Sequence, residues 1–257
     1  MVFERVICGV DSSPESLEAV RQAERLLAPE GRMLVVGVAE TQLAVHAGWL
    51  ATTVADEIDV AARRALDEAR AALSTRDSVA TRLIEGDPVS CFLHTAAEED
   101  ATLIAVGTHG RGRATGILLG GVATAMLHDA NCSVLIARAP RGRGTFPRSV
   151  VVGTDGSRHS KAAHDAAVEL QERLGCEVRV VVAEGGKPVD IDGLARIPEL
   201  AWDARKPVDA LLAASDDADL VIVGSRGLHG YASFGSVSER VAHEARSSVL
   251  VVRARTE

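Results

Sequence analysis

Short apolar runs alternate with helical patterns along the first 140 residues of the chain. Helical spacing of apolar residues begins after Ser13, where a proline and a glutamate follow as in a typical first turn. A longer amphipathic helix is predicted from Val54 to Leu73. The apolar runs have the length of buried strands: Val6–Val10, Leu34–Ala39, Thr81–Ile84, Leu103–Val106 and Val134–Ala137. Strands that alternate with helices predict an α/β fold with a parallel sheet.

Residues 149–257 repeat this pattern at nearly constant offsets. Gly9-Val10-Asp11 returns 144 residues later as Gly153-Thr154-Asp155, and Ser133-Val134-Leu135 returns 115 residues later as Ser248-Val249-Leu250. We therefore expect two tandem, doubly wound parallel-sheet domains, residues 1–140 and 149–257. Residues 141–148, rich in Arg, Gly and Pro, are interpreted as a mobile linker.

The second copy is shorter than the first after its second strand. Only 22 residues, Gly185 to Lys206, stand where the first copy has 47, Thr41 to Asp87. This difference predicts that the second domain is truncated there and lacks the long second helix. A loop and a short strand around Glu199–Trp202 are expected in its place, because about a dozen residues already suffice for a parallel crossover.

In each copy the fourth strand ends in a glycine-spaced loop. The first loop has Gly107, Gly110 and, after nine residues, Gly120-Gly121; the second has Gly224, Gly227 and, after seven residues, Gly235-Ser236. Glycines between a strand and a helix let backbone N–H groups come close to phosphate oxygens. The loops therefore predict a nucleotide ligand.

Composition and charge narrow the class of protein. Hydrophobic residues make up 47% and charged residues 25% of the 257-residue chain, enough to bury two cores. The formal charge of -8 argues against a general nucleic-acid surface, which needs clustered cations. No apolar run approaches the roughly 18 residues of a membrane span, and the N-terminus shows no targeting pattern. We expect a cytoplasmic protein that binds neither membranes nor nucleic acid.

With these features the chain resembles the universal stress protein family in its tandem two-domain form. The resemblance is carried by both glycine loops and by four shorter segments: Val10-Asp11-Ser12-Ser13, Thr154-Asp155-Gly156-Ser157, Cys132-Ser133-Val134-Leu135-Ile136 and Ser247-Ser248-Val249-Leu250-Val251-Val252. It implies Rossmann-like, five-stranded domains with strand order 3-2-1-4-5. The family's ATP-binding members have a Ser or Thr after the third glycine of the loop. Here Gly121 replaces that residue in the first copy, whereas the second copy keeps Ser236 but has the shorter loop.

The resemblance implies sites for ATP or AMP, with Mg²⁺ as a candidate companion ion. Asp11 and Asp155 would accept hydrogen bonds from the ribose or adenine, and Val38 and Val182 would contact the adenine. The phosphates would meet the backbone of two further sets of residues: Gly107, Gly110, Gly120, Gly121 and Val122 in the first copy, and Gly224, Gly227, Gly235, Ser236 and Val237 in the second. The open alternative is that the aspartates cap helices and the glycines form ordinary turns.

The resemblance favours an adenine-nucleotide-binding stress-response sensor or regulator without dedicated catalysis, although slow incidental ATP hydrolysis stays open. A nucleotide-independent interaction scaffold is the first alternative. An adenylating or ATP-hydrolysing enzyme is the second, but neither a GxxxxGK[ST] loop nor an adenylating-enzyme motif is present. The histidine and cysteine spacing predicts no metal site.

The last apolar strand of each copy predicts how the copies pair. In the family this strand lies at a sheet edge, where an unpaired apolar strand invites aggregation. We expect Val134–Ala137 and Val249–Val252 to pair antiparallel across an internal pseudo-twofold axis. A homodimer is a further option.

Overall fold

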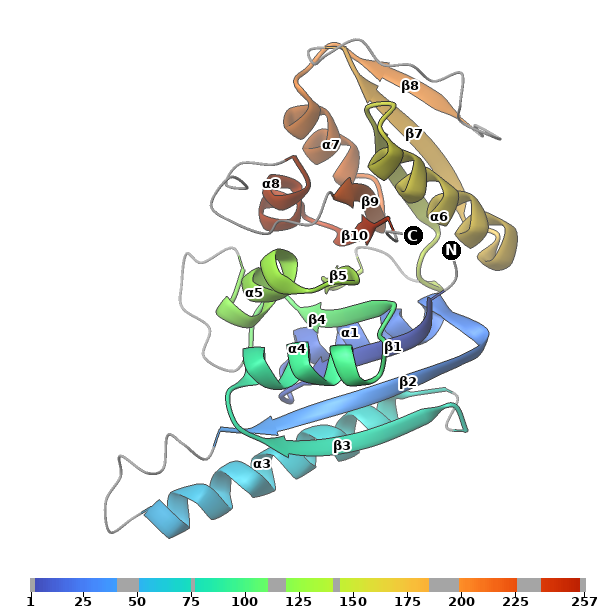
Figure 1. Cartoon of the computed structure of the whole chain (residues 1–257). Helices are drawn as coiled ribbons and strands as arrows, with labels where there is room; N and C mark the ends of the chain where they lie inside the picture. The colour runs from blue at the N-terminus through green and yellow to red at the C-terminus, as the bar shows by residue number, and fades with distance from the viewer. Residues whose placement is uncertain are drawn as a thin grey trace. The chain divides into compact units, whose positions relative to one another are not determined.

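The computed structural model describes residues 3–40, 51–74, 77–110, 119–140, 144–184, 199–225 and 237–254. The chain forms two compact units, of which one comprises Phe3–Met126 and the other begins at Leu127. Each unit combines parallel strands with helices that pack on them (Figure 1). The predicted α/β class is therefore confirmed, whereas the predicted linker at 141–148 remains a prediction.

The first unit is built on a parallel sheet of order β3-β2-β1-β4. Its strands are β1 (Phe3–Val10), β2 (Leu27–Ala39), β3 (Val79–Glu85) and β4 (Leu103–Gly107). Its helices are α1 (Pro14–Leu26), α3 (Ala51–Ala72), α4 (Pro88–Glu98) and the start of α5 (Gly121–Asp129). The sequence patterns predicted these strands and the helices α1 and α3, and the structure extends β1 and β2 toward the N-terminus because their early residues still pair.

Local side-chain caps define where two of these helices begin. The Ser13 Oγ accepts a hydrogen bond from the Ser16 N–H at 3.1 Å at the start of α1. The Asp87 carboxylate accepts one from the Ser90 N–H at 2.8 Å at the start of α4. A proline follows each cap, where no intrahelical N–H is needed. Both helices consequently start at fixed points directly after the strands that precede them.

Glycines in the central strands let helices approach both faces of the sheet. A Cβ on Gly37 would lie 3.1 Å from Leu66 of α3, and a Cβ on Gly9 would lie 2.5 Å from the Phe92 ring of α4. Gly37 is in register with Val10, the residue after Gly9. Because successive residues of a strand point to opposite faces, α3 and α4 cover opposite faces of the sheet. Figure 1 shows α4 in front of the strands and α1 behind them.

The second unit contains a sheet of order β5-β10-β9-β6-β7-β8. Its strands are β5 (Ser133–Ala137), β6 (Ser149–Thr154), β7 (Glu177–Ala183), β8 (Leu200–Asp203), β9 (Leu220–Ser225) and β10 (Ser248–Arg253). Its further helices are α6 (Arg158–Leu174), α7 (Pro207–Ser215) and α8 (Val237–Glu244). The short strand β8 lies at the predicted position. The predicted loss of the long second helix concerns residues 185–198, which lie outside the described residues.

Strands β5 and β10 pair antiparallel, while the other strand pairs of this unit are parallel. Val251 lies opposite Val134, and Leu250 lies opposite Leu135. All four side chains are at most 2% exposed. The pair therefore forms part of a closed apolar core rather than an open sheet edge.

Two arginines 115 residues apart in the sequence form hydrogen bonds that join β5 and β10. The Arg138 N–H donates to the Ser248 Oγ at 3.0 Å, and the Arg253 N–H donates to the Ser133 Oγ at 3.2 Å. The Arg138 guanidinium also donates to a carbonyl of α8 at 2.6 Å, and that of Arg253 donates to a carbonyl of α5 at 2.7 Å. A cation is favourable at a helix C-terminus, where carbonyls lack intrahelical partners.

No helix in the described part of the chain is both long and apolar enough to cross a membrane.

A charge placed between β5 and β10 should separate the two strands. We expect Val251→Asp to destabilise the chain by about 3 kcal/mol or more, because a carboxylate would be buried without a partner. Calorimetric melting and light scattering should show a lower Tm and aggregates. Val60→Asp is the control, because Val60 is 65% exposed on α3. A monodisperse Val251→Asp protein with unchanged melting would refute the assignment.

The buried Asp219 should make stability depend on pH. Its carboxylate accepts hydrogen bonds from the Arg148 Nε at 2.9 Å and Nη2 at 2.8 Å, which hold the pKa of Asp219 below its usual value. A lowered carboxyl pKa stabilises the fold above about pH 4, and this contribution disappears as the pH falls through the folded-state pKa. Asp219→Asn should lower stability by about 1–3 kcal/mol at pH 7 and weaken the acid dependence.

Chemical denaturation at pH 7 and at a series of acidic pH values measures both effects. Asp59→Asn is the control, because Asp59 forms an exposed ion pair with Arg63 on α3. Equal acid dependence in the wild type and Asp219→Asn would contradict the prediction.

Candidate functional site

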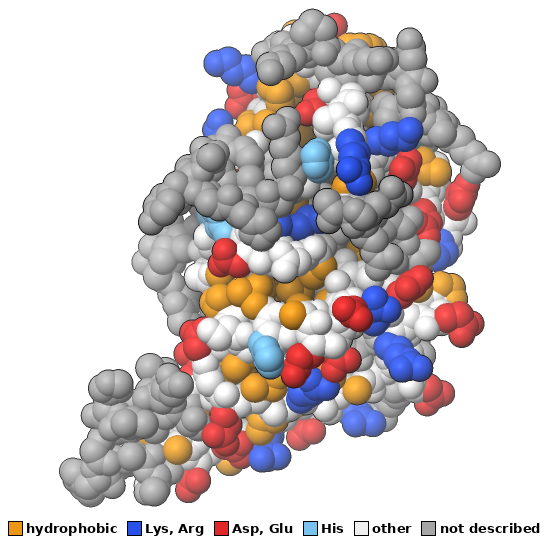
Figure 2. All heavy atoms as spheres, viewed as in Figure 1, with side chains coloured by type: hydrophobic (Ala, Val, Ile, Leu, Met, Phe, Trp, Pro, Cys, Tyr) orange, Lys and Arg blue, Asp and Glu red, His pale blue; other side chains and the backbone are white. Residues whose placement is uncertain are grey.

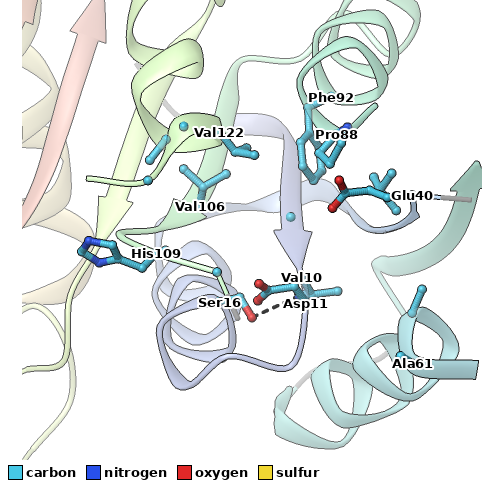
Figure 3. Close-up of a pocket in the computed structure, with 18 of the residues that line it drawn as sticks. Val10, Asp11, Ser16, Glu40, Ala61, Pro88, Phe92, Val106, His109 and Val122 are labelled. Atoms are coloured by element: carbon cyan, nitrogen blue, oxygen red, sulfur yellow. Dashed lines mark hydrogen bonds between the residues drawn. The ribbon is translucent and has the colours of Figure 1, made fainter. Parts of the chain in front are cut away.

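A cavity of about 500 Å³ lies at the carboxyl ends of β1, β2 and β4 in the first unit (Figure 3). This is the edge at which ligands bind in open α/β sheets. The site residues predicted in the first copy all line it: Asp11, Val38, Gly107, Gly110, Gly120, Gly121 and Val122. The structure thus brings together residues from three strands and the start of α5.

Asp11 is held in place by the turn that leads into α1. Its carboxylate accepts hydrogen bonds from the Ser13 N–H at 3.1 Å and the Ser13 Oγ at 2.6 Å. The Ser13 Oγ lies 3.3 Å from the His109 carbonyl of the glycine loop. The cap of α1 is Ser13 and not, as the alternative interpretation expected, Asp11; Asp11 holds the capping residue in place and also faces the cavity.

Gly107 has a packing role that the sequence alone did not reveal. A Cβ at this position would lie 2.7–2.9 Å from the backbone and Cβ of Glu15 in α1. Gly224 occupies the equivalent position in β9, where a Cβ would meet the backbone of His159 in α6. The close approach of a helix, in addition to any ligand, therefore requires glycine at the end of each fourth strand.

The other loop glycines differ in the space around them. A Cβ on Gly110 would meet the Asp11 carboxylate, whereas a Cβ on Gly121 would have no neighbour within 4 Å. The Gly120 N–H donates to the Thr108 carbonyl at 2.7 Å, which brings the end of β4 next to the start of α5. The first N–H groups of α5 have no intrahelical acceptors, so this end of the cavity is suited to an anion.

Sequence reasoning predicted α3 as a helix but placed neither α3 nor α4 beside the cavity. Val54 and Ile58 of α3 and Phe92 of α4 line it together with Val38. Figure 3 shows Phe92 and Pro88 near Glu40, which follows the end of β2. The helical spacing of Val54 and Ile58 was visible in the sequence, but the strand that α3 covers was not. The result is an apolar wall opposite the glycine loop.

The charged side chains of the lining are acidic. Asp11, Glu40 and Glu57 line the cavity together with His109. Within the described residues, no Lys or Arg contributes to the lining. Figure 2 shows acidic and basic side chains interspersed over the described surface of the face in view. No group of three or more His, Cys, Asp or Glu arranged to hold a metal ion occurs in the described part of the chain.

The second copy is described less fully. Asp155 follows β6, and burial acts to raise its pKa, but hydrogen bonds from Ser157 and Ser160 outweigh burial and lower that pKa. Val182 lies in β7, and Val237 begins α8. Three predicted residues lie outside the described residues: Gly227, Gly235 and Ser236. A nucleotide site in this copy therefore stays a prediction.

Parallel α/β units with a cavity at the strand ends and a glycine-spaced turn define a class typical of nucleotide-binding proteins. The profile of the universal stress protein family matches residues 3–138 and 187–253, so the chain belongs to this family. It is 28% identical to the universal stress protein Rv2623 of Mycobacterium tuberculosis over 293 aligned positions, which cover 96% of both chains.

Solved structures agree with the fold. A universal stress protein from Archaeoglobus fulgidus aligns with a TM-score of 0.73 and 22% identity, covering 97% of this chain and 96% of that one. A universal stress protein solved in complex with cAMP covers 54% of this chain and 98% of its own, with 25% identity. Its TM-score of 0.37 is too low to bear on the ligand of the present chain.

The two roles of the loop glycines can be separated by substitution. Gly107→Ala should destabilise the protein by about 1–3 kcal/mol, because the added methyl group meets the backbone of α1. Gly121→Ala should leave the free energy of unfolding nearly unchanged, because its Cβ enters open space. Urea denaturation of both variants measures the difference, and equal destabilisation would contradict the packing role.

Proposed function

We propose that this protein binds an adenine nucleotide in the cavity of the first unit and acts as a stress-response sensor or regulator without dedicated catalysis. The observation that carries the proposal is the cavity itself. One of its ends is formed by Gly110 and the start of α5 at Gly121. Its other end offers the apolar surface of Val38 and Phe92, with Glu40 and Glu57 beside them. A nucleotide matches these two ends, because it combines a phosphate group with an aromatic base.

The lining suggests how such a ligand would be held. Phosphate oxygens would accept hydrogen bonds from the free N–H groups at the start of α5, near Gly121 and Val122. The base would lie against Val38 and Phe92, which offer apolar surface. Asp11, already fixed by Ser13, would accept a hydrogen bond from a ribose hydroxyl.

Catalysis is not part of the proposal. The turn after β1 reads Asp11-Ser12-Ser13-Pro14, without the glycine-rich or paired-histidine motifs of adenylating enzymes. A phosphate-loop lysine motif is also missing from the sequence. A scaffold that has lost nucleotide binding is the competing function, favoured by the replacement of a hydroxyl residue by Gly121.

Calorimetry of the intact chain with ATP and AMP, with and without Mg²⁺, tests the proposal. Gly110→Val should weaken nucleotide binding by at least about tenfold, because its side chain would displace the Asp11 carboxylate. Val60→Ala is the control, because Val60 is exposed on α3 and does not line the cavity. Circular dichroism and melting confirm that Gly110→Val is folded.

The outcomes separate the three functions. Binding that is lost in Gly110→Val supports a nucleotide-binding regulator. If the protein releases no nucleotide when denatured and gives no heat with ATP or AMP, the scaffold is correct. Turnover of ATP at rates typical of enzymes, roughly 1 s⁻¹ or more, would favour the enzyme.

A further inference from the structure

We propose that the cavity of the first unit selects its ligand by charge, and that a nucleoside monophosphate is accommodated better than a triphosphate. This inference rests on the proposed nucleotide-binding function and names the ligand class for that site. It follows from the sign of the charges in the lining, from the absence of partners for Glu40 and Glu57 among the described residues, and from the chemistry of the phosphate end.

The first observation is the sign of the charges. Carboxylates enter the lining from three elements: Asp11 from the end of β1, Glu40 from the end of β2 and Glu57 from α3. Figure 3 shows Asp11 and Glu40 facing the cavity from neighbouring strands. No cationic Lys or Arg balances them among the described lining residues. A ligand that enters the cavity therefore meets a negative field on several sides.

The second observation is that two of these charges are not neutralised within the described residues. The carboxylates of Glu40 and Glu57 take part in no ion pair or hydrogen bond there. Other acids of α3 are paired: Asp59 lies 2.7 Å from the Arg63 Nε, and Glu68 lies 2.7 Å from that of Arg64. Arg63 and Arg64 thus neutralise carboxylates elsewhere on α3, and among the described residues neither of them pairs with Glu57 at the cavity.

The third observation concerns the phosphate end. Gly121 offers an N–H but no hydroxyl, and the start of a helix carries only about half a positive charge. A monophosphate brings roughly two negative charges, which this end can partly balance. Each further phosphate adds negative charge to a cavity whose lining already carries the carboxylates of Asp11, Glu40 and Glu57. Like charges about 8 Å apart repel enough to lower affinity several-fold, even when partly screened.

The change of affinity with salt concentration distinguishes repulsion by carboxylates from attraction by cationic groups. Salt normally weakens the binding of a phosphate to cationic groups, because it screens an attraction. If carboxylates dominate, salt screens a repulsion and should strengthen the binding of the more highly charged ligand. Arg111 and Arg113 lie in the glycine loop outside the described residues. If they dominated the field, the salt effect would have the opposite sign.

The experiment is calorimetry of the full chain with adenosine, AMP, ADP and ATP in the presence of a chelator, at about 0.05 and 0.5 M salt. We expect AMP to bind at least about tenfold more tightly than ATP at low salt, and the difference to narrow as salt is added. ATP that binds more tightly than AMP and is weakened by salt would overturn the inference while supporting the proposed function. No binding of any of the four ligands would overturn both.

Variants assign the effect to residues. Glu40→Gln and Glu57→Gln keep the size of each side chain and remove its charge, so each should strengthen ATP binding about three- to tenfold and AMP binding less. Glu68→Gln, which removes an arginine-paired charge from the same helix as Glu57, is the control and should change neither affinity. Equal effects of the three substitutions would contradict a role of the lining carboxylates.

Discussion

Helix α1 lies so close to the end of β4 that only a glycine fits between them, and the geometry of the cavity depends on this contact. The missing side chain of Gly107 leaves room for the backbone of Glu15, which a Cβ at this position would contact too closely. The same approach brings the Ser13 cap within 3.3 Å of the His109 carbonyl, so the turn after β1 and the turn after β4 are joined. The edge of the cavity is therefore fixed by packing within the chain itself. A ligand would find a preformed site, which lowers the ordering entropy lost on binding.

The sequence predicted the elements of the fold because each has a strong local signal. Apolar runs marked the strands, Ser13 marked the start of α1, and the repeat offsets showed that the fold occurs twice. The first-copy residues also converge on one cavity, because parallel strands end at one edge of a sheet. The sequence could not predict that Glu57 lines the cavity, since the position of this side chain depends on how α3 crosses the sheet. The packing role of Gly107 was hidden for the same reason: its neighbour Glu15 is distant in sequence.

The two copies also differ in the side chain that packs against the glycine of the first strand. In the first copy the glycine of the first strand receives the ring of Phe92, and in the second copy Gly153 receives Leu211. The aromatic ring also lines the cavity described above. A duplicated backbone has thus kept the space that a glycine provides while changing the side chain that fills it. Divergence of this kind changes the wall of one cavity without altering the fold.

The pairing of β5 with β10 has a consequence for how such a protein can be divided. β5 is the last strand of the first repeat, yet it lies in the compact unit that begins at Leu127. Arg138, just after β5, closes the end of α8 in the other repeat. The segment that was duplicated and the segment that packs as a unit are therefore offset by one strand. Splitting the gene at the repeat boundary would separate α8 from its arginine and strand β10 from its neighbour.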